Sequence, residues 1–135
     1  MIVICPLTIG IIGIIDYKSY KIPNAILIGW LGVAVFIDVL NNITPNIIFT
    51  KLITGIIVAG SYIPISCFVK ASAGDFKLFA VLTYVMGIDD MLATLLITML
   101  ISLLPLFSGI KKTPIGFVLY FGYIAFELLR MEGLI

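Results

Sequence analysis

Two aspartates, Asp16 and Asp75, are the residues whose type and placement best suit chemistry, because each lies at the edge of a strongly apolar segment. The chain has only seven acidic residues among 135. A carboxylate at the boundary of an apolar helix is costly and often marks a functional site. Two carboxylates held close together do not both ionise easily, so one keeps its proton while the other acts as a base. The pair therefore predicts the machinery of an aspartic protease.

The aspartates also have simpler interpretations. An acid at a helix boundary is often a solvated helix end, and Asp75 could complement the positive N-terminus of its own helix. The rival functional class is a non-enzymatic membrane protein, a small transporter subunit or an assembly scaffold, in which Asp16, Asp75 and Lys77 form an ion path. That class would tolerate exchange of aspartate for glutamate, whereas a protease should lose cleavage when either aspartate becomes asparagine.

Residue types exclude several other chemistries. The sequence has no histidine and only two cysteines, Cys5 and Cys67, so Ser/His/Asp and Cys/His catalysis are ruled out. Zinc also lacks its usual ligands. We therefore expect no metal and no cofactor, with acid–base chemistry left to carboxylates, lysines or tyrosines. No basic patch with interleaved aromatic residues is present, and we expect no nucleic-acid partner.

The elements that position the aspartates follow from composition. The chain is 62% hydrophobic and 11% charged, with a mean hydropathy of +1.29, whereas soluble domains are about 45–50% apolar and about 25% charged. This composition predicts an integral membrane protein of the all-α class, a polytopic bundle of six transmembrane helices. We expect a single transmembrane domain over residues 1–135. The polar breaks divide the chain into apolar segments at residues 1–15, 25–40, 52–69, 78–88, 91–107 and 115–129.

The six-helix count depends on a break at residues 87–90. Asp89 and Asp90 would cost several kcal/mol at the middle of a membrane, so they should lie in a turn. Basic residues favour cytoplasmic loops. With the N-terminus outside, six of the eight basic residues face the cytosol, and only Lys51 and Arg130 face outward. The six are Lys18, Lys21, Lys70, Lys77, Lys111 and Lys112.

This topology sorts the acidic residues and the cysteines by depth. Asp16 should end the first helix and Asp75 should begin the fourth, both at the cytosolic side of the plasma membrane, whereas Asp38 should lie near the outer end of the second helix. Cys5 should lie near the outer side and Cys67 near the cytosolic side, which makes a disulfide between them improbable.

Three segments give the chain a family resemblance. Asp16 is followed, after five residues, by Ile22-Pro23-Asn24; the second segment is Gly74-Asp75-Phe76-Lys77-Leu78; and a weaker third is Lys112-Thr113-Pro114-Ile115-Gly116-Phe117. Together they resemble the type IV prepilin peptidase family, which includes preflagellin peptidases and shares a GxGD signature with other membrane aspartyl proteases. Ser72 stands where that signature has its first glycine. The chain has no cysteine-rich segment and resembles the short, peptidase-only form.

The resemblance implies a membrane aspartic endopeptidase, a hydrolase. It would remove the basic leader from prepilin, pilin-like or preflagellin precursors at the cytosolic membrane face. Asp16 and Asp75 would be the catalytic pair that activates water, with no covalent intermediate. Such a substrate would keep its hydrophobic helix in the lipid bilayer and its leader in the cytoplasm. The scissile bond would then lie at the depth of the two aspartates.

Four further residues are candidates for active-site support or substrate binding. Gly74 would allow close approach of backbone to substrate, or it is a packing glycine. Lys77 would stabilise the anionic form of Asp75 or hold substrate backbone, or it is a lysine that extends to the membrane surface. Pro23 and Asn24 are expected to start the second helix and to act on the site indirectly. Pro114 and Gly116 are expected to start the last helix.

Overall fold

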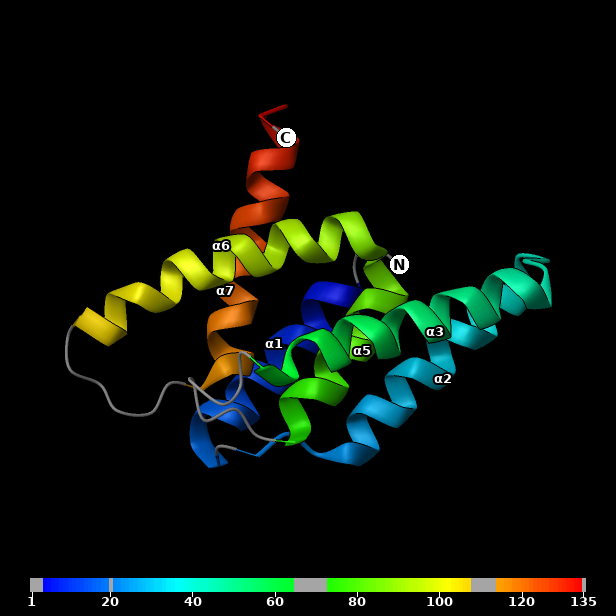
Figure 1. Ribbon diagram of the computed structural model, residues 1–135, viewed down its shortest axis with the longest axis horizontal. Coiled ribbons are helices and arrows are strands. Elements are labelled where there is room, and N and C mark those ends of the chain that lie inside the picture. The colour runs from blue at the N-terminus through cyan, green and yellow to red at the C-terminus, as the bar shows by residue number, and fades with distance from the viewer. Residues whose placement is uncertain (1–3, 20, 65–72, 108–113, 135) are drawn as a thin grey trace. The chain divides into compact units, whose positions relative to one another are not determined.

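The computed structural model describes residues 4–19, 21–64, 73–107 and 114–134. Regular structure in these residues is helical throughout, which confirms the predicted all-α class (Figure 1). The helices are α1 (Ile4–Ser19), α2 (Asn24–Leu40), α3 (Pro45–Ser61), α5 (Ala73–Met86), α6 (Ile88–Phe107) and α7 (Ile115–Met131).

Prolines set the starts of three helices. Pro23 and Pro114 are the N-caps of α2 and α7, with extended backbones, and their carbonyls accept first-turn hydrogen bonds, such as the one from the Val118 amide to Pro114 at 3.1 Å. Pro45 opens α3 at a position where a missing N–H costs nothing. The starts of α2 and α7 agree with the sequence analysis. The third apolar segment begins at residue 52, whereas α3 begins at Pro45, so this helix extends into the polar residues before its apolar segment.

The early start of α3 has a physical reason. Asn46, Thr50 and Lys51 suggest a polar loop, but in the structure they lie on the first turns of the helix. The Thr50 hydroxyl donates to the Asn46 carbonyl at 2.8 Å, a bond that a helical backbone accommodates. Residues 65–69, at the end of the predicted segment, lie outside the described residues.

A glycine separates α5 from α6, as predicted. Gly87 has φ of 89°, a conformation that glycine adopts at low cost, and its amide donates to the Thr83 carbonyl at 3.0 Å. The prediction that Asp89 and Asp90 lie in the turn itself is wrong, because α6 begins at Ile88 and both residues lie in its first turn, where negative charge is favourable. The break therefore combines a helix end at glycine with acidic residues at the next helix start.

The chain divides into two compact units, the first formed by residues 1–20 and 92–135 and the second by residues 21–91. In the first unit, α1 packs along α7. A Cβ built on Gly13 would lie 3.2 Å from the Gly116 carbonyl oxygen, so small residues allow these helices to approach closely. In the second unit, α5 packs against α3 and α2. A Cβ on Gly55 would lie 2.6 Å from the Ala80 carbonyl oxygen, so α3 needs glycine at this contact.

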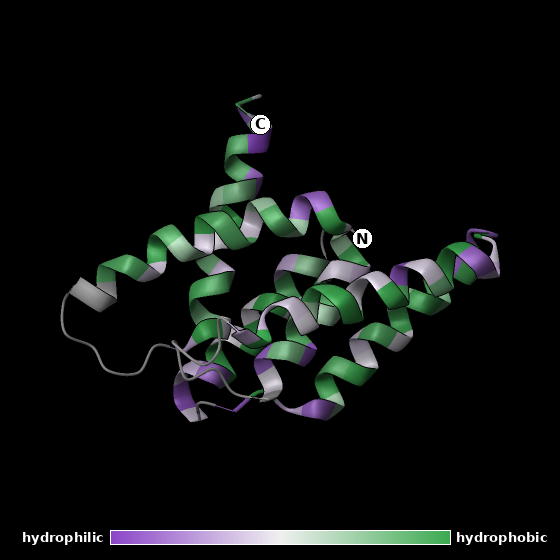
Figure 2. Cartoon of the chain, viewed as in Figure 1, coloured by the Kyte–Doolittle hydropathy of each residue, from purple (hydrophilic) through white to green (hydrophobic). Residues whose placement is uncertain are grey.

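Hydrophobic residues are not confined to helix contacts. Figure 2 shows apolar residues over most of the helices and hydrophilic ones mainly near helix ends. Many large apolar side chains are exposed, among them Ile28, Phe36, Ile56, Leu96, Leu100 and Leu104. In the described part of the chain, no helix combines the length and the apolar character needed to cross a membrane. The transmembrane arrangement and its orientation stay predictions.

Candidate active site

Asp16 lies in the last turn of α1 and is only 3% exposed. The backbone amide of Gly116, the second residue of α7, donates a hydrogen bond to Asp16 Oδ2 at 2.7 Å. The first amides of a helix have no partner within the helix, and the N-cap Pro114 makes no side-chain hydrogen bond to them. Asp16 therefore caps α7 from a different helix, and the weak third motif is in direct contact with the first aspartate.

Aromatic side chains pack beside this contact. The rings of Tyr17 and Phe117, the residues that follow Asp16 and Gly116, have centroids 4.9 Å apart. Phe117 also meets Phe121 edge-on at 5.0 Å. The Tyr17–Phe117 contact holds the end of α1 to the start of α7 next to the carboxylate, and Phe121 packs on Phe117 from within α7.

Asp75 is the third residue of α5 and is 4% exposed. A carboxylate in the first turn of a helix is stabilised by the helix dipole. Gly74 precedes it in the same turn and is partly exposed. The predicted start of this helix near Ala71 lies outside the described residues, and within them Asp75 is in the first turn, as predicted. Ser72 lies outside the described residues.

Lys77 and Asn24 are brought together by the structure. Lys77 Nζ donates to Asn24 Oδ1 at 3.0 Å, at the exposed ends of α5 and α2. Pro23, the residue before Asn24, is the N-cap of α2. Lys77 is therefore hydrogen-bonded at an exposed helix end, which also fits a lysine that extends to the membrane surface. Its predicted roles toward Asp75 and toward substrate stay predictions, as does the predicted approach of Asp16, in the first unit, to Asp75, in the second.

Sequence reasoning missed a third buried carboxylate. Asp38, near the end of α2, is 6% exposed. Its Oδ2 accepts hydrogen bonds from Lys51 Nζ at 2.9 Å and from the Tyr84 hydroxyl at 2.8 Å. Lys51 Nζ also lies 5.4 Å from the centre of the Tyr84 ring. The sequence feature that could have predicted this contact is the short turn between α2 and α3, because it places Asp38 and Lys51 at the same end of a helical hairpin.

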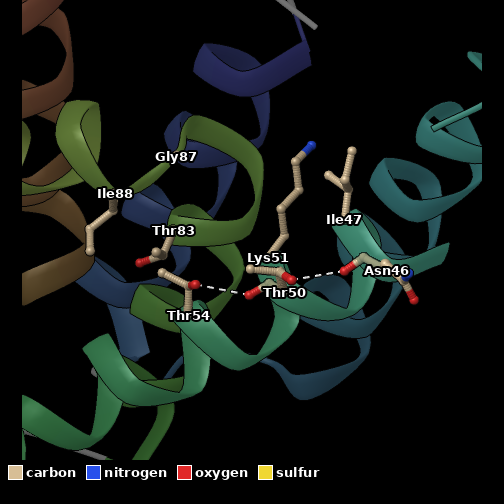
Figure 3. A pocket seen from close by; sticks show the side chains of 8 residues that line it. All are labelled: Asn46, Ile47, Thr50, Lys51, Thr54, Thr83, Gly87 and Ile88. Carbon is tan, nitrogen blue, oxygen red and sulfur yellow. Dashed lines mark hydrogen bonds between the residues drawn. The ribbon is translucent and has the colours of Figure 1, made fainter. Parts of the chain in front are cut away.

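A pocket of about 330 Å³ lies in the second unit, between α3 and the end of α5 (Figure 3). Its threonine hydroxyls are engaged, since Thr54 donates to the Thr50 carbonyl and Thr83 to the Phe79 carbonyl. The lining residues are Asn46, Ile47, Thr50, Lys51, Thr54, Thr83, Gly87 and Ile88. Neither Asp75 nor Lys77 is among them, because these lie at the opposite end of α5.

Metal-binding side chains do not gather in the described residues, where no group of three or more Cys, Asp or Glu could hold an ion. Cys5 is buried and unpaired in the structure. Cys67, which is predicted not to form a disulfide with Cys5, lies outside the described residues.

Comparison with known proteins gives one match. A protein-family model described as the type IV leader peptidase family matches residues 3–107. This range includes both the Asp16 segment and the Asp75 segment, and the match confirms the resemblance seen in the sequence. No curated protein and no solved structure matches the chain significantly.

Proposed function

Since this chain belongs to the type IV leader peptidase family, and is therefore a peptidase, we propose that it is a membrane aspartic endopeptidase. Its substrates are prepilin-type precursors, from which it removes a short basic leader at the cytosolic membrane face. The observation that carries the proposal is the family match over residues 3–107, which contains both aspartates in their expected motifs.

Burial and bonding support the choice of Asp16 and Asp75. Among the seven acidic residues, three are buried, namely Asp16, Asp38 and Asp75. The buried oxygen of Asp38 is bonded to a lysine and a tyrosine of its own unit. This carboxylate is therefore engaged in contacts that hold α2, α3 and α5 together. Asp16 and Asp75 lie in the family motifs, so we assign them the catalytic roles.

The reaction is a general acid–base hydrolysis. One aspartate, as the carboxylate, takes a proton from water, and the water oxygen forms a bond to the scissile carbonyl carbon. The other aspartate gives its proton to the carbonyl oxygen, which produces a tetrahedral diol. The proton taken from water then passes to the leaving nitrogen as the C–N bond breaks. The protonated diol oxygen returns its proton to the second aspartate, which restores the pair.

The membrane assignment rests on composition and on exposed apolar surface. The chain is 62% hydrophobic, and it exposes Phe36, Ile56 and Leu100 by more than half, as lipid-facing side chains would be. We place it as a multi-pass protein of the plasma membrane, N-terminus outside, with residues 1–135 acting as one peptidase domain. The bilayer holds both enzyme and substrate helix, so the scissile bond meets the aspartates at the cytosolic face.

Supporting roles go to the residues around Asp75. Lys77 and Asn24, which share a hydrogen bond, fix the start of α5 against the start of α2 and thereby orient Asp75. Pro23 sets where α2 begins. Gly74 gives the substrate backbone room to approach. In this arrangement none of the four takes part in proton transfer.

The direct test is co-expression of the chain with a candidate prepilin in cells that lack leader-peptidase activity. Leader removal is read as a mobility shift of the precursor, and N-terminal sequencing of the product locates the cut. We expect cleavage between the basic leader and the hydrophobic helix. A precursor that stays intact beside well-expressed membrane-inserted enzyme, across several pilin, pseudopilin and preflagellin substrates, would contradict the proposal.

A further inference from the structure

Gly116 lies outside the matched range of residues 3–107, yet its backbone contacts Asp16. The two residues are 100 positions apart, and the hydrogen bond between them is buried. Both belong to the first unit, so their contact depends on the packing of α1 against α7. A residue of the last helix is thus bonded to the carboxylate assigned to catalysis.

We propose that Gly116 is a positioning residue for Asp16, and that α7 is for this reason part of the peptidase site. The proposal rests on the proposed function of Asp16. Through its backbone N–H, Gly116 holds Oδ2 in one orientation and stabilises the negative charge that the carboxylate carries when it acts as a base.

The location of Asp16 explains why such a donor is needed. Asp16 lies in the last turn of α1, where the negative end of the helix dipole disfavours a carboxylate. Its side chain is also removed from water, which disfavours charge further. The start of α7 offers the opposite end of a dipole together with an unpaired amide. At 2.7 Å, this hydrogen bond is at the short end of the usual range for N–H···O bonds.

Glycine gives Asp16 room at this contact. A Cβ at position 116 would lie 3.1 Å from Asp16 Oδ2 and 3.2 Å from Asp16 Cβ, so an alanine would press directly on the carboxylate. Gly10 is the matched control on the same pair of helices. A Cβ there would lie 3.2 Å from the Tyr120 ring, an equally tight approach that touches no carboxylate. The two alanine variants therefore crowd the α1–α7 contact similarly, but only one of them moves Asp16.

The first test measures cleavage kinetics of a prepilin-type precursor by the full-length protein in detergent. We expect Gly116→Ala to lower kcat on the order of 10- to 100-fold, because small displacements of catalytic groups have effects of this size. KM should stay within about twofold, since precursor binding is separate from this chemistry. Gly10→Ala should keep both constants near wild type. The proposal is overturned if Gly116→Ala keeps the wild-type kcat or changes only KM. It is also overturned if Gly10→Ala lowers kcat as much as Gly116→Ala does.

The second test reads the hydrogen bond without any activity. In protein labelled with ¹⁵N-glycine, the Gly116 amide is assigned by its absence in Gly116→Ala, and we expect its proton resonance at low field. Asp16→Asn should shift that resonance far more than Asp89→Asn does. If the Gly116 resonance does not shift in Asp16→Asn, the proposal is overturned even if the protein cleaves precursors. A wild-type chain that cleaves no precursor refutes the peptidase function instead, while this measurement still reports whether Gly116 holds Asp16.

Discussion

Lys77 donates a hydrogen bond to Asn24 at 3.0 Å, so two segments that are separated by 53 positions in the sequence meet in space. Asn24 ends the Ile-Pro-Asn motif that follows Asp16, and Lys77 lies two residues after Asp75. The bond fixes the first turns of α2 and α5 against each other within the second unit. The Ile-Pro-Asn motif and the Asp75 motif are therefore joined by a structural contact.

Breaking this contact should slow cleavage without abolishing it. We expect Lys77→Met, which keeps the length of the side chain, and Asn24→Ala each to lower the cleavage rate severalfold, because Asp75 loses part of its support. If the bond is the cause, the double variant should be no slower than the worse single variant. The measurement is the cleavage rate of the wild type, the two single variants and the double variant. Effects that multiply in the double variant would show that Lys77 acts elsewhere, on Asp75 or on substrate.

The aspartyl mechanism predicts a sharp division among the acidic residues. Asp16→Asn and Asp75→Asn should each reduce precursor cleavage below detection while the protein stays in the membrane fraction, because asparagine neither takes nor gives the required proton. Asp89→Asn and Asp90→Asn are the controls, since both lie at the start of α6 and outside the motifs. Cleavage that survives either of the first two substitutions would refute the mechanism.

The two catalytic variants also separate chemistry from capping. Asparagine keeps a side-chain oxygen that accepts a hydrogen bond, so Asp16→Asn should retain the cap on α7 and the thermal stability of the fold. Exchange of either aspartate for glutamate should also impair cleavage severely, because the longer side chain misplaces the carboxylate. An ion path, by contrast, tolerates that exchange.

The contact between Asp38 and Lys51 should affect stability and leave catalysis intact. Lys51→Met removes one partner of a carboxylate that is 8% exposed. Because the Lys51 side chain is 38% exposed, the loss should fall below that of a fully buried pair, at about 1–2 kcal/mol of unfolding free energy. Tyr84→Phe, which removes the second donor, should cost roughly 1 kcal/mol. Denaturant titration in detergent measures both losses.

Cleavage by these two variants, assayed well below their unfolding midpoints, should stay near wild type. The reason is that Asp38 and Tyr84 lie toward the ends of α2 and α5, whereas Asn24 and Asp75 lie at their starts. From the sequence, Asp38 is predicted only to lie near the outer end of the second helix. The structure makes it a poor activity control, because its removal would disturb three helices. A specific loss of kcat in a fully folded Lys51→Met protein would show that this contact belongs to the site.

The sequence predicted those features that depend on local signals. Pro23 and Pro114 mark helix starts, and Gly87 with Asp89 marks a break, because each restricts its own backbone. The apolar pattern of the third segment begins at residue 52 and does not specify how far the helix extends into the polar residues before it, such as Asn46 and Thr50. Contacts between distant residues left no such signal. The bonds from Gly116 to Asp16 and from Tyr84 to Asp38 depend on how helices pack, and no spacing in the chain encodes them.

The proposed topology predicts which side of the membrane each helix end faces. After both native cysteines are replaced by serine, Lys18→Cys should react with a membrane-impermeant thiol reagent only from the cytosolic side, and Asp90→Cys only from outside. Both positions lie at helix ends that the excess of inward basic residues orients oppositely. Intact cells present the outer side of the membrane to the reagent, and inverted vesicles present the cytosolic side. Detergent-permeabilised samples confirm that each cysteine is reactive. Cytosolic labelling at position 90 would invalidate the six-helix count, and Asp89 and Asp90 would then become rivals of Asp16 and Asp75 for the active site.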